Sequence, residues 1–498
     1  MLEMKTAQRI AVNMGTEVLV HAGPRLARIQ PLRQAIVKRV ETRLVDQFQR
    51  NRETSRFPLG VDEDRALIGV SVLHTAERAM SEHNLSPATR RALFKTLIQK
   101  LMLEGTDPGT AGQFEATYGT KPPLFLLLSP SKACNLHCIG CYADSDAREK
   151  KLDWATVDRI ITEAKTLWGS RFFAISGGEP LAYRSDGKGI LDIAEKHSDC
   201  FFIMYTNGTL IDNQVAHRLS QLGNLTPALS LEGWRGKTDA RRGEGIFDKV
   251  VDAMWRLRDA GVIYGVSLTP TRHNAEEILS DEFIDFCFSE QGALYGFMFQ
   301  YMPIGRSITL DLMPTPEQRL KMWRRSWDLI RERRIFLADF WNHGTLSQGC
   351  LSAGGFSGWG YFYVDWNGSV SPCVFMPYSP LNIHDLYAQG KNLNDLWGEP
   401  FFAGIRKWQK SYRQTNGNWL RPCPIRDHHA EFRNLQAQYE PEPLDENARA
   451  ALLDPDYAKG LEEYDETYQQ MSDPIWTAHY LQSSTSQGDT FRDLPEVK

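Results

Sequence analysis

The sequence lacks any apolar run long enough to cross a bilayer. Its longest strongly apolar run is Leu124–Leu128, far short of the roughly 20 residues that a membrane helix needs. Residues 1–23 also lack the continuous apolar region of a secretory signal. These absences favour a cytoplasmic protein, and thiols stay reduced in that compartment. Its eight cysteines are therefore expected to be metal ligands or core residues rather than disulfides.

An excess of charge of one sign is also absent. The net charge is −5 over 498 residues, so no nucleic-acid partner is expected. The distribution is uneven: residues 1–60 hold 11 Lys/Arg against 5 Asp/Glu, and residues 440–498 hold 4 against 14. The length exceeds that of a single hydrophobic core. We therefore expect a basic start and an acidic end, both appended to a neutral central domain.

Residues 1–120 have the pattern of a helical N-terminal extension. Helices are expected over Ala27–Phe48 and Pro87–Leu103. The first places its apolar side chains on one face and most of its arginines and lysines elsewhere. We interpret the extension as a helical cap packed on the main domain. The alternative is a basic amphipathic helix that contacts a membrane surface or an acidic partner.

Residues 121–335 alternate short apolar strands with amphipathic helices such as Trp154–Leu167 and Ile246–Arg258. This alternation predicts βα units around a parallel sheet, an α/β fold. Six units make an incomplete (β/α)6 TIM-like barrel, whose chemistry belongs at the carboxyl ends of the strands. The expected strands are Leu124–Leu128, Phe172–Ser176, Phe201–Tyr205, Ala228–Leu231, Tyr264–Leu268 and Leu294–Tyr301.

Two further segments follow the expected barrel. Residues 336–435 are rich in Gly, Trp and Pro, and we interpret them as a separate small module. Within it, Phe362–Val370 has the pattern of a hairpin with Asn367-Gly368 as its turn. Residues 436–498 form an acidic, proline-interrupted tail, which we expect to be partly helical at best and partly disordered.

Three cysteines lie within eight residues, directly after the first expected strand: Cys134, Cys138 and Cys141. Soft thiolates of this kind select iron–sulfur clusters or zinc. On a four-iron cluster, three cysteines leave one iron free to chelate the amino and carboxylate groups of S-adenosylmethionine. The alternatives are unrelated core cysteines or a zinc site, although zinc normally takes four ligands and only His137 is nearby.

The spacing and placement of these cysteines resemble those of the radical S-adenosylmethionine (radical SAM) superfamily. Ser176-Gly-Gly-Glu-Pro180 ends the second strand and resembles the family's GGEP motif. Tyr205-Thr-Asn-Gly208 and Ser230-Leu-Glu-Gly233 end the third and fourth strands, the latter with Glu where the family has Asp. Arg241-Arg-Gly243 follows, and Tyr301–Arg306 ends the sixth strand.

This resemblance implies a role for each motif in a pocket for S-adenosylmethionine. Glu179 and nearby backbone groups would bind the methionyl amino group. One of the two arginines would bind the carboxylate, and the segment after the sixth strand would contact the adenine. The residues expected to contact the cofactor are Tyr142, Ser176, Gly177, Gly178, Glu179, Thr206, Asn207, Ser230, Glu232, Arg242, Met302 and Pro303.

Three more cysteines, Cys350, Cys373 and Cys423, lie in the Gly- and Trp-rich module. Their surroundings resemble the SPASM extension, which holds auxiliary [4Fe–4S] clusters. The full pattern of that extension has more cysteines, and Arg426 stands where a partner of Cys423 would sit. One auxiliary cluster is expected here, and its fourth ligand would be water, substrate, Asp427 or the histidines at 428 and 429. A degenerate module without metal is the alternative. The remaining two cysteines, Cys200 and Cys287, are expected in the core.

The resemblance implies reductive cleavage of S-adenosylmethionine to a 5′-deoxyadenosyl radical, which abstracts hydrogen from an unactivated carbon. A peptide or protein side chain is the expected substrate, and a small metabolite, tetrapyrrole or lipid is the alternative. The electron would come from a reductase, flavodoxin or ferredoxin. A non-catalytic iron–sulfur sensor or electron carrier is a third hypothesis. The complete Gly177-Gly-Glu179 and Thr206-Asn-Gly208 motifs argue against it, since a sensor needs no cofactor pocket.

Overall fold

The computed structural model describes residues 30–51, 57–82, 84–92, 108–147, 150–415 and 417–481. Its central feature is a ten-stranded sheet in the order β11-β9-β8-β1-β2-β3-β4-β5-β6-β7. Strands β1 to β7 run parallel to one another. They are β1 (Phe125–Leu128), β2 (Phe172–Ile175), β3 (Phe201–Thr206), β4 (Leu225–Leu231), β5 (Gly265–Leu268), β6 (Tyr295–Met298) and β7 (Phe336–Asp339).

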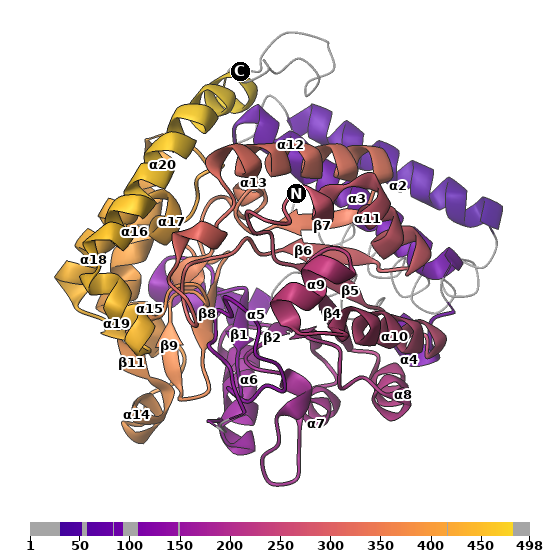
Figure 1. Ribbon diagram of the computed structural model, residues 1–498, viewed down its shortest axis with the longest axis horizontal. Helices are drawn as coiled ribbons and strands as arrows, with labels where there is room; N and C mark the ends of the chain where they lie inside the picture. The colour runs from indigo at the N-terminus through magenta and orange to yellow at the C-terminus, as the bar shows by residue number, and fades with distance from the viewer. Residues whose placement is uncertain are drawn as a thin grey trace.

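Helices cover the outside of this curved sheet, as in a partial barrel (Figure 1). Several of these helices begin at a polar capping side chain. Asp153 accepts a hydrogen bond from Thr156 N at the start of the helix over Trp154–Leu167, and the apolar face of that helix is buried. The expected α/β incomplete barrel is thereby confirmed. The covering helices are α6 (Trp154–Leu167), α7 (Ile190–Lys196), α8 (Asn213–Leu222), α9 (Arg235–Arg242), α10 (Ile246–Asp259), α11 (Asp281–Asp285) and α12 (Pro316–Arg333).

The sheet extends beyond the six expected strands. A seventh parallel strand, β7, follows α12. The expected hairpin forms from β8 (Tyr361–Val364) and β9 (Ser369–Ser371). However, β8 also pairs in parallel with β1, with Leu128 opposite Val364. The Gly- and Trp-rich segment therefore shares the sheet of the barrel. Two short strands, β10 (Tyr378–Ser379) and β12 (Glu442–Pro443), pair apart from this sheet, and β11 (Leu381–Asn382) extends it beside β9.

The described part of the N-terminal region is helical. It consists of α2 (Gln30–Asn51), α3 (Leu59–Glu82), α4 (Pro87–Ala92) and α5 (Pro108–Tyr118). Helix α2 packs on α3, and α3 packs on α12 and β7, as the upper part of Figure 1 shows. Residues 93–107, where the second expected helix continues, lie outside the described residues. No described helix is both long and apolar enough to traverse a bilayer.

The prediction of a partly disordered tail is wrong for residues 440–481. They form α19 (Glu446–Leu453), α20 (Pro455–Ile475) and a π-helical turn, η7 (Trp476–Leu481). On α20, Tyr457, Leu461 and Tyr468 are buried, because spacings of four and seven residues, about one and two helical turns, place them on one face. The acidic residues occupy the other faces. With α16 (Pro400–Gln414) and α18 (His429–Tyr439), these helices cover the side of the sheet that carries β8 (Figure 1). Residues 482–498 lie outside the described residues.

Candidate active site

The carboxyl ends of the parallel strands surround a cavity with about 1050 Å³ of empty space, partly open to solvent. Its lining comes from β1, β3, β4 and β5 and from the segments directly after β2 and β6, and Phe375 adds to it from the segment after β9. Twelve of the expected site residues line this cavity: Cys134, Cys138, Cys141, Tyr142, Ser176, Gly177, Gly178, Thr206, Asn207, Ser230, Arg242 and Met302. Glu179, Glu232 and Pro303 are not part of the lining.

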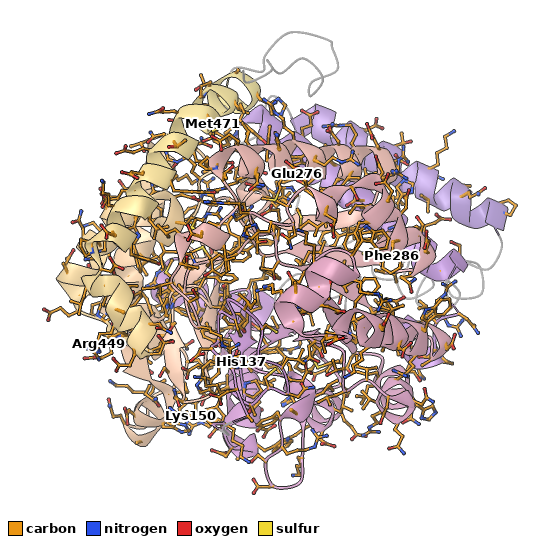
Figure 2. The ribbon with its side chains drawn as sticks, viewed as in Figure 1. His137, Lys150, Glu276, Phe286, Arg449 and Met471 are labelled. Atoms are coloured by element: carbon orange, nitrogen blue, oxygen red, sulfur yellow. The ribbon has the colours of Figure 1, made fainter. Side chains whose placement is uncertain are left out.

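The cysteine loop holds three free thiols, each partly exposed. The pKa of Cys134 is raised to about 11, chiefly by burial and further by the charges of Glu179, Cys138 and Cys141. Among the described residues, no three His, Cys, Asp or Glu side chains converge closely enough to bind one ion. A four-iron cluster binds each thiolate at a different iron, so three thiols on one loop suit it better than they suit zinc, which normally takes four ligands. His137, labelled in Figure 2, is exposed.

The loop after β6 fastens the cysteine loop. Arg306 donates through Nη1 to the carbonyl of Cys138 at 2.6 Å, and its backbone N–H donates to the carbonyl of Cys141 at 2.9 Å. Gly305 has a φ of +68°, and a Cβ there would stand 2.2 Å from the Tyr142 carbonyl. Arg306 therefore positions two of the thiols, a role that the sequence motif did not reveal.

The two glycines after β2 allow the backbone to pack against the cysteine loop. A Cβ at Gly178 would lie 2.1 Å from the Ala133 carbonyl oxygen, closer than real contacts allow. The N–H groups of Gly178 and Glu179 donate to the carbonyls of Ser131 and Ala133, at 2.9 and 2.8 Å. The motif thus fixes the backbone beside Cys134 as well as lining the cavity.

Glu179 is buried, and both of its carboxylate oxygens are used within the protein. Oε1 accepts from Thr206 Oγ1 at 2.7 Å and from Leu181 N at 3.1 Å, while Oε2 accepts from Asn207 N at 2.8 Å. Burial raises the pKa of Glu179, and these hydrogen bonds oppose that rise. In this structure Glu179 positions the segment after β3. That segment includes Asn207, whose Nδ2 donates to Asn135 Oδ1 at 2.9 Å.

Glu232 likewise acts on its neighbours. Its Oε1 receives hydrogen bonds from Arg241 Nη1 at 2.6 Å and Arg242 Nε at 2.7 Å, while its Oε2 is buried without a partner. Although burial opposes the charge of Arg242, the Glu232 carboxylate raises the pKa of that guanidinium. Arg242 is therefore a fixed cation in the cavity wall. Pro303 lies behind the wall, where its carbonyl accepts from Tyr457 OH at 3.2 Å.

Other residues line the cavity without having been expected. Tyr205, Ser267, Thr269, Phe299, Gln300 and Phe375 belong to this group. Ser267 and Thr269 lie at the carboxyl end of β5, so the general rule for barrels could have identified them. Phe375 could not be found in this way, because it comes from the segment after β9. Its ring lies 6.1 Å from that of Tyr142, whose hydroxyl lies 2.7 Å from Ser176 Oγ.

A second group of thiols gathers in the C-terminal half. Burial raises the pKa of Cys373 to about 12, with the charge of Cys350 next. The pKa of Cys423 is likewise raised by burial and then by Asp427, Cys350 and Cys373. Each of these two thiols thus feels the charge of at least one of the other auxiliary cysteines. Burial therefore favours the neutral thiols, whereas a cluster would bind them as thiolates, and its iron would supply the positive charge that offsets the cost of burying them.

The expected fourth ligands have other partners in this structure. Asp427 forms an ion pair with Arg319, and its Oδ2 accepts from Cys423 N at 3.1 Å. His428 Nε2 lies 3.0 Å from the carbonyl oxygen of Arg421. His429 Nδ1 lies 2.8 Å from the carbonyl oxygen of residue 425, while its Nε2 is buried without a partner.

Comparisons with known proteins identify two domain families and several relatives of this chain. Residues 128–281 match the radical SAM superfamily, and residues 350–424 match SPASM, an iron–sulfur cluster-binding domain. Mycofactocin maturase MftC of Mycolicibacterium smegmatis is 31% identical over 301 residues, which cover 58% of this chain and 71% of that protein. AdoMet-dependent heme synthase of Methanosarcina barkeri is 25% identical over 297 residues, covering 53% and 81%. The structure of Streptococcus suis SuiB bound to precursor peptide SuiA is 22% identical with a TM-score of 0.48, over 59% of this chain and 69% of that one.

Proposed function

Because the chain belongs to the radical SAM superfamily and carries a SPASM iron–sulfur domain, we propose that it is a maturation enzyme that modifies a side chain of a peptide or protein. When bound on Cys134, Cys138 and Cys141, a [4Fe–4S] cluster with S-adenosylmethionine supplies a 5′-deoxyadenosyl radical that abstracts hydrogen from the substrate. The observation that carries the proposal is the cavity at the strand ends, which these thiols line together with the expected motifs.

In this proposal the residues of the chain bind and orient S-adenosylmethionine and shield the radical from water. Arg242, held by Glu232, offers a fixed cation for the carboxylate of S-adenosylmethionine. Glu179 holds the β3 segment in place through Thr206 and Asn207. The rings of Phe299 and Phe375, 6.1 Å apart, form an apolar wall that excludes water from a reactive radical.

The similarity to a maturase supports a precursor peptide or protein as the substrate. A second candidate substrate is a tetrapyrrole, since AdoMet-dependent heme synthase of Methanosarcina barkeri is also similar to this chain. The SPASM match supports one auxiliary cluster on Cys350, Cys373 and Cys423. We place the enzyme in the cytoplasm, where reducing conditions keep such thiols available.

An electron donor must reach the cluster site from outside. Asn135, His137 and Ile139 of the cysteine loop are exposed, Ile139 by 55%. A large apolar side chain in the open beside the thiols suits transient contact with a protein donor. A reductase, flavodoxin or ferredoxin would fill this role.

The first experiment tests the chemistry. Anaerobically reconstituted protein, given dithionite and S-adenosylmethionine, should release 5′-deoxyadenosine, detected by liquid chromatography and mass spectrometry. Replacing Cys134, Cys138 and Cys141 by alanine should abolish both this release and the cluster's absorption. The control is Cys287→Ala, which removes a buried thiol outside the cavity and should leave the release unchanged. Release by the triple variant would refute the proposal.

The second experiment tests the substrate class. The wild-type enzyme is incubated in parallel with short peptides encoded beside its gene and with an iron porphyrin. A mass change confined to one residue of a peptide, with 5′-deoxyadenosine formed in step, supports the peptide proposal. Turnover of the porphyrin alone would replace it with the tetrapyrrole candidate.

A further inference from the structure

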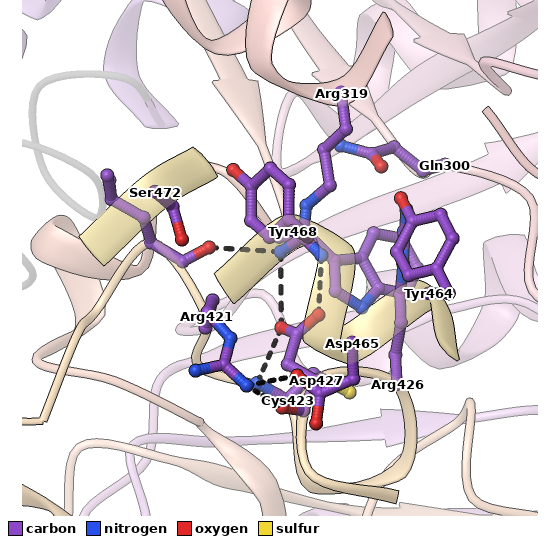
Figure 3. A network of polar contacts seen from close by, with 12 residues as sticks. Gln300, Arg319, Arg421, Cys423, Arg426, Asp427, Tyr464, Asp465, Tyr468 and Ser472 are labelled. Atoms are coloured by element: carbon purple, nitrogen blue, oxygen red, sulfur yellow. Dashed lines mark hydrogen bonds and ion pairs between the residues drawn. The ribbon is translucent and has the colours of Figure 1, made fainter. Parts of the chain in front are cut away.

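Three arginines are buried where the barrel meets the C-terminal helices, and one of them forms no ion pair with a described residue. Arg319 pairs with Asp427, and Arg421 pairs with Asp465 (Figure 3). Arg426 is fully buried, yet it forms no ion pair with any described residue. Its Nη2 donates to Tyr464 OH at 2.5 Å, while its Nε and Nη1 are buried without a hydrogen-bond partner.

A buried guanidinium without an anion is costly. Removing an ion from water carries a penalty of several kcal/mol even after relaxation. The rings of Tyr464 and Trp341, with centroids 5.0 and 5.4 Å from the guanidinium carbon, return only about 0.5 to 2 kcal/mol each. Asp427, the nearest acid in sequence, forms its close ion pair with Arg319 and interacts with Arg426 only at longer range. These contacts offset only part of the cost of burying the Arg426 charge, so a further negative charge nearby would stabilise it.

The position of Arg426 shows where that charge would come from. It lies one helical turn after Cys423, whose thiol accepts the backbone N–H of Arg426. Trp341, which faces the guanidinium, packs on Phe375 at 4.8 Å between ring centroids. The backbone N–H of Phe375 donates in turn to Cys373 Sγ at 3.4 Å. Arg426 thus contacts Cys423 through its backbone and is linked to Cys373 through Trp341 and Phe375.

We propose that Arg426 is the buried counter-ion of the auxiliary iron–sulfur cluster and that it raises the reduction potential of this cluster. The inference rests on the proposed binding of that cluster by Cys350, Cys373 and Cys423. Three thiolates outweigh the charge of a four-iron core, so the loaded site is anionic, and one-electron reduction adds another negative charge. A nearby cation in a medium of low dielectric constant stabilises the reduced form more than the oxidised form.

The experiment isolates the auxiliary cluster. In full-length protein with Cys134, Cys138 and Cys141 changed to alanine, iron is counted, and the potential of the remaining cluster is measured by titration with dithionite, followed by electron paramagnetic resonance. Arg426→Gln and Arg426→Lys are introduced into this background. The control is Lys407→Gln, which removes the same charge from an exposed position of α16, where solvent screens it.

Arg426→Gln should make the potential more negative, with at least a tenfold change in the oxidised-to-reduced ratio at fixed potential, or 59 mV for one electron. Arg426→Lys, which keeps the charge, and Lys407→Gln should stay close to the parent. Loss of iron from Arg426→Gln with retention in Arg426→Lys would equally support a required charge. Equal potentials for Arg426→Gln and Lys407→Gln, or loss of iron from both Arg426 variants, would overturn the inference. Absence of iron from the parent itself would instead refute the auxiliary cluster.

Discussion

A buried acid on α3 makes the stability of this protein depend on pH. Asp64 is fully buried, and its Oδ2 accepts hydrogen bonds from Thr345 Oγ1 at 2.7 Å and Tyr480 OH at 2.9 Å. It therefore links the N-terminal helices, the segment before Cys350 and the C-terminal turn η7. Burial raises the pKa of Asp64 to about 8, and the two hydrogen bonds offset this only in part.

The size of the effect follows from linkage between proton binding and folding. An unfolded Asp has a pKa of about 3.9, so between pH 4 and 8 the folded state binds the proton and the unfolded state does not. The contribution of Asp64 is then present in full below the unfolded pKa and is lost as the pH rises through 8. The loss of stability approaches about 1.4 kcal/mol for each pH unit well below pH 8, and the slope falls by about half at pH 8, where the folded carboxyl is half ionised. The total loss between pH 6 and 8 is therefore about 2 kcal/mol.

The assay compares urea unfolding of the wild type and Asp64→Asn at pH 6, 7 and 8. The asparagine cannot ionise, so the free energy of unfolding of the wild type should fall by about 2 kcal/mol more than that of the variant. The difference between the two proteins removes the contribution of every other titrating group. Asp252→Asn, at a side chain that is 63% exposed on α10, should show the wild-type slope. Parallel pH curves for the wild type and Asp64→Asn would refute a raised pKa at this site.

Two further predictions concern the candidate sites. Gly178→Ala should reduce the formation of 5′-deoxyadenosine about 100-fold, since a Cβ 2.1 Å from the Ala133 carbonyl displaces the cysteine loop. Gly236→Ala, where a Cβ meets no atom within 4 Å, should keep wild-type activity, and equal rates for the two variants would contradict this reasoning. Arg319→Met should lower the free energy of unfolding by about 3 to 5 kcal/mol, because Asp427 is left as an uncompensated buried charge. Urea unfolding measures this loss, and changing Asp427 to leucine in the same chain should restore much of it.

Much of the candidate site could be predicted because its residues follow a rule of parallel sheets. Carboxyl ends of neighbouring parallel strands meet at one edge, so motifs placed after successive strands come together regardless of helix packing. The direction of each side chain is not given by that rule. Glu179 and Glu232 hold residues of the cavity wall rather than line it, since their orientation depends on hydrogen bonds formed only in the folded chain.

The parts that were missed depend on long-range contacts. Strand β8 is short, and its pairing with β1 joins segments more than 230 residues apart, which local periodicity does not register. The helices of the tail were hidden by acidic composition, although Tyr457, Leu461 and Tyr468 carry a helical repeat. The acidic composition of the tail predicted a solvated, partly disordered segment, whereas the helical spacing of a few apolar residues determines its structure.

The pairing of β8 with β1 has a consequence for the relation between the two thiol groups. Cys134 follows β1, Cys373 follows the hairpin that begins with β8, and Leu128 and Val364 stand opposite each other at the base of both. Two segments that are hydrogen-bonded as neighbouring strands are held more rigidly than two segments joined by a flexible linker. Any redox groups held at these two places would keep a constant separation even when the helices and loops around them move.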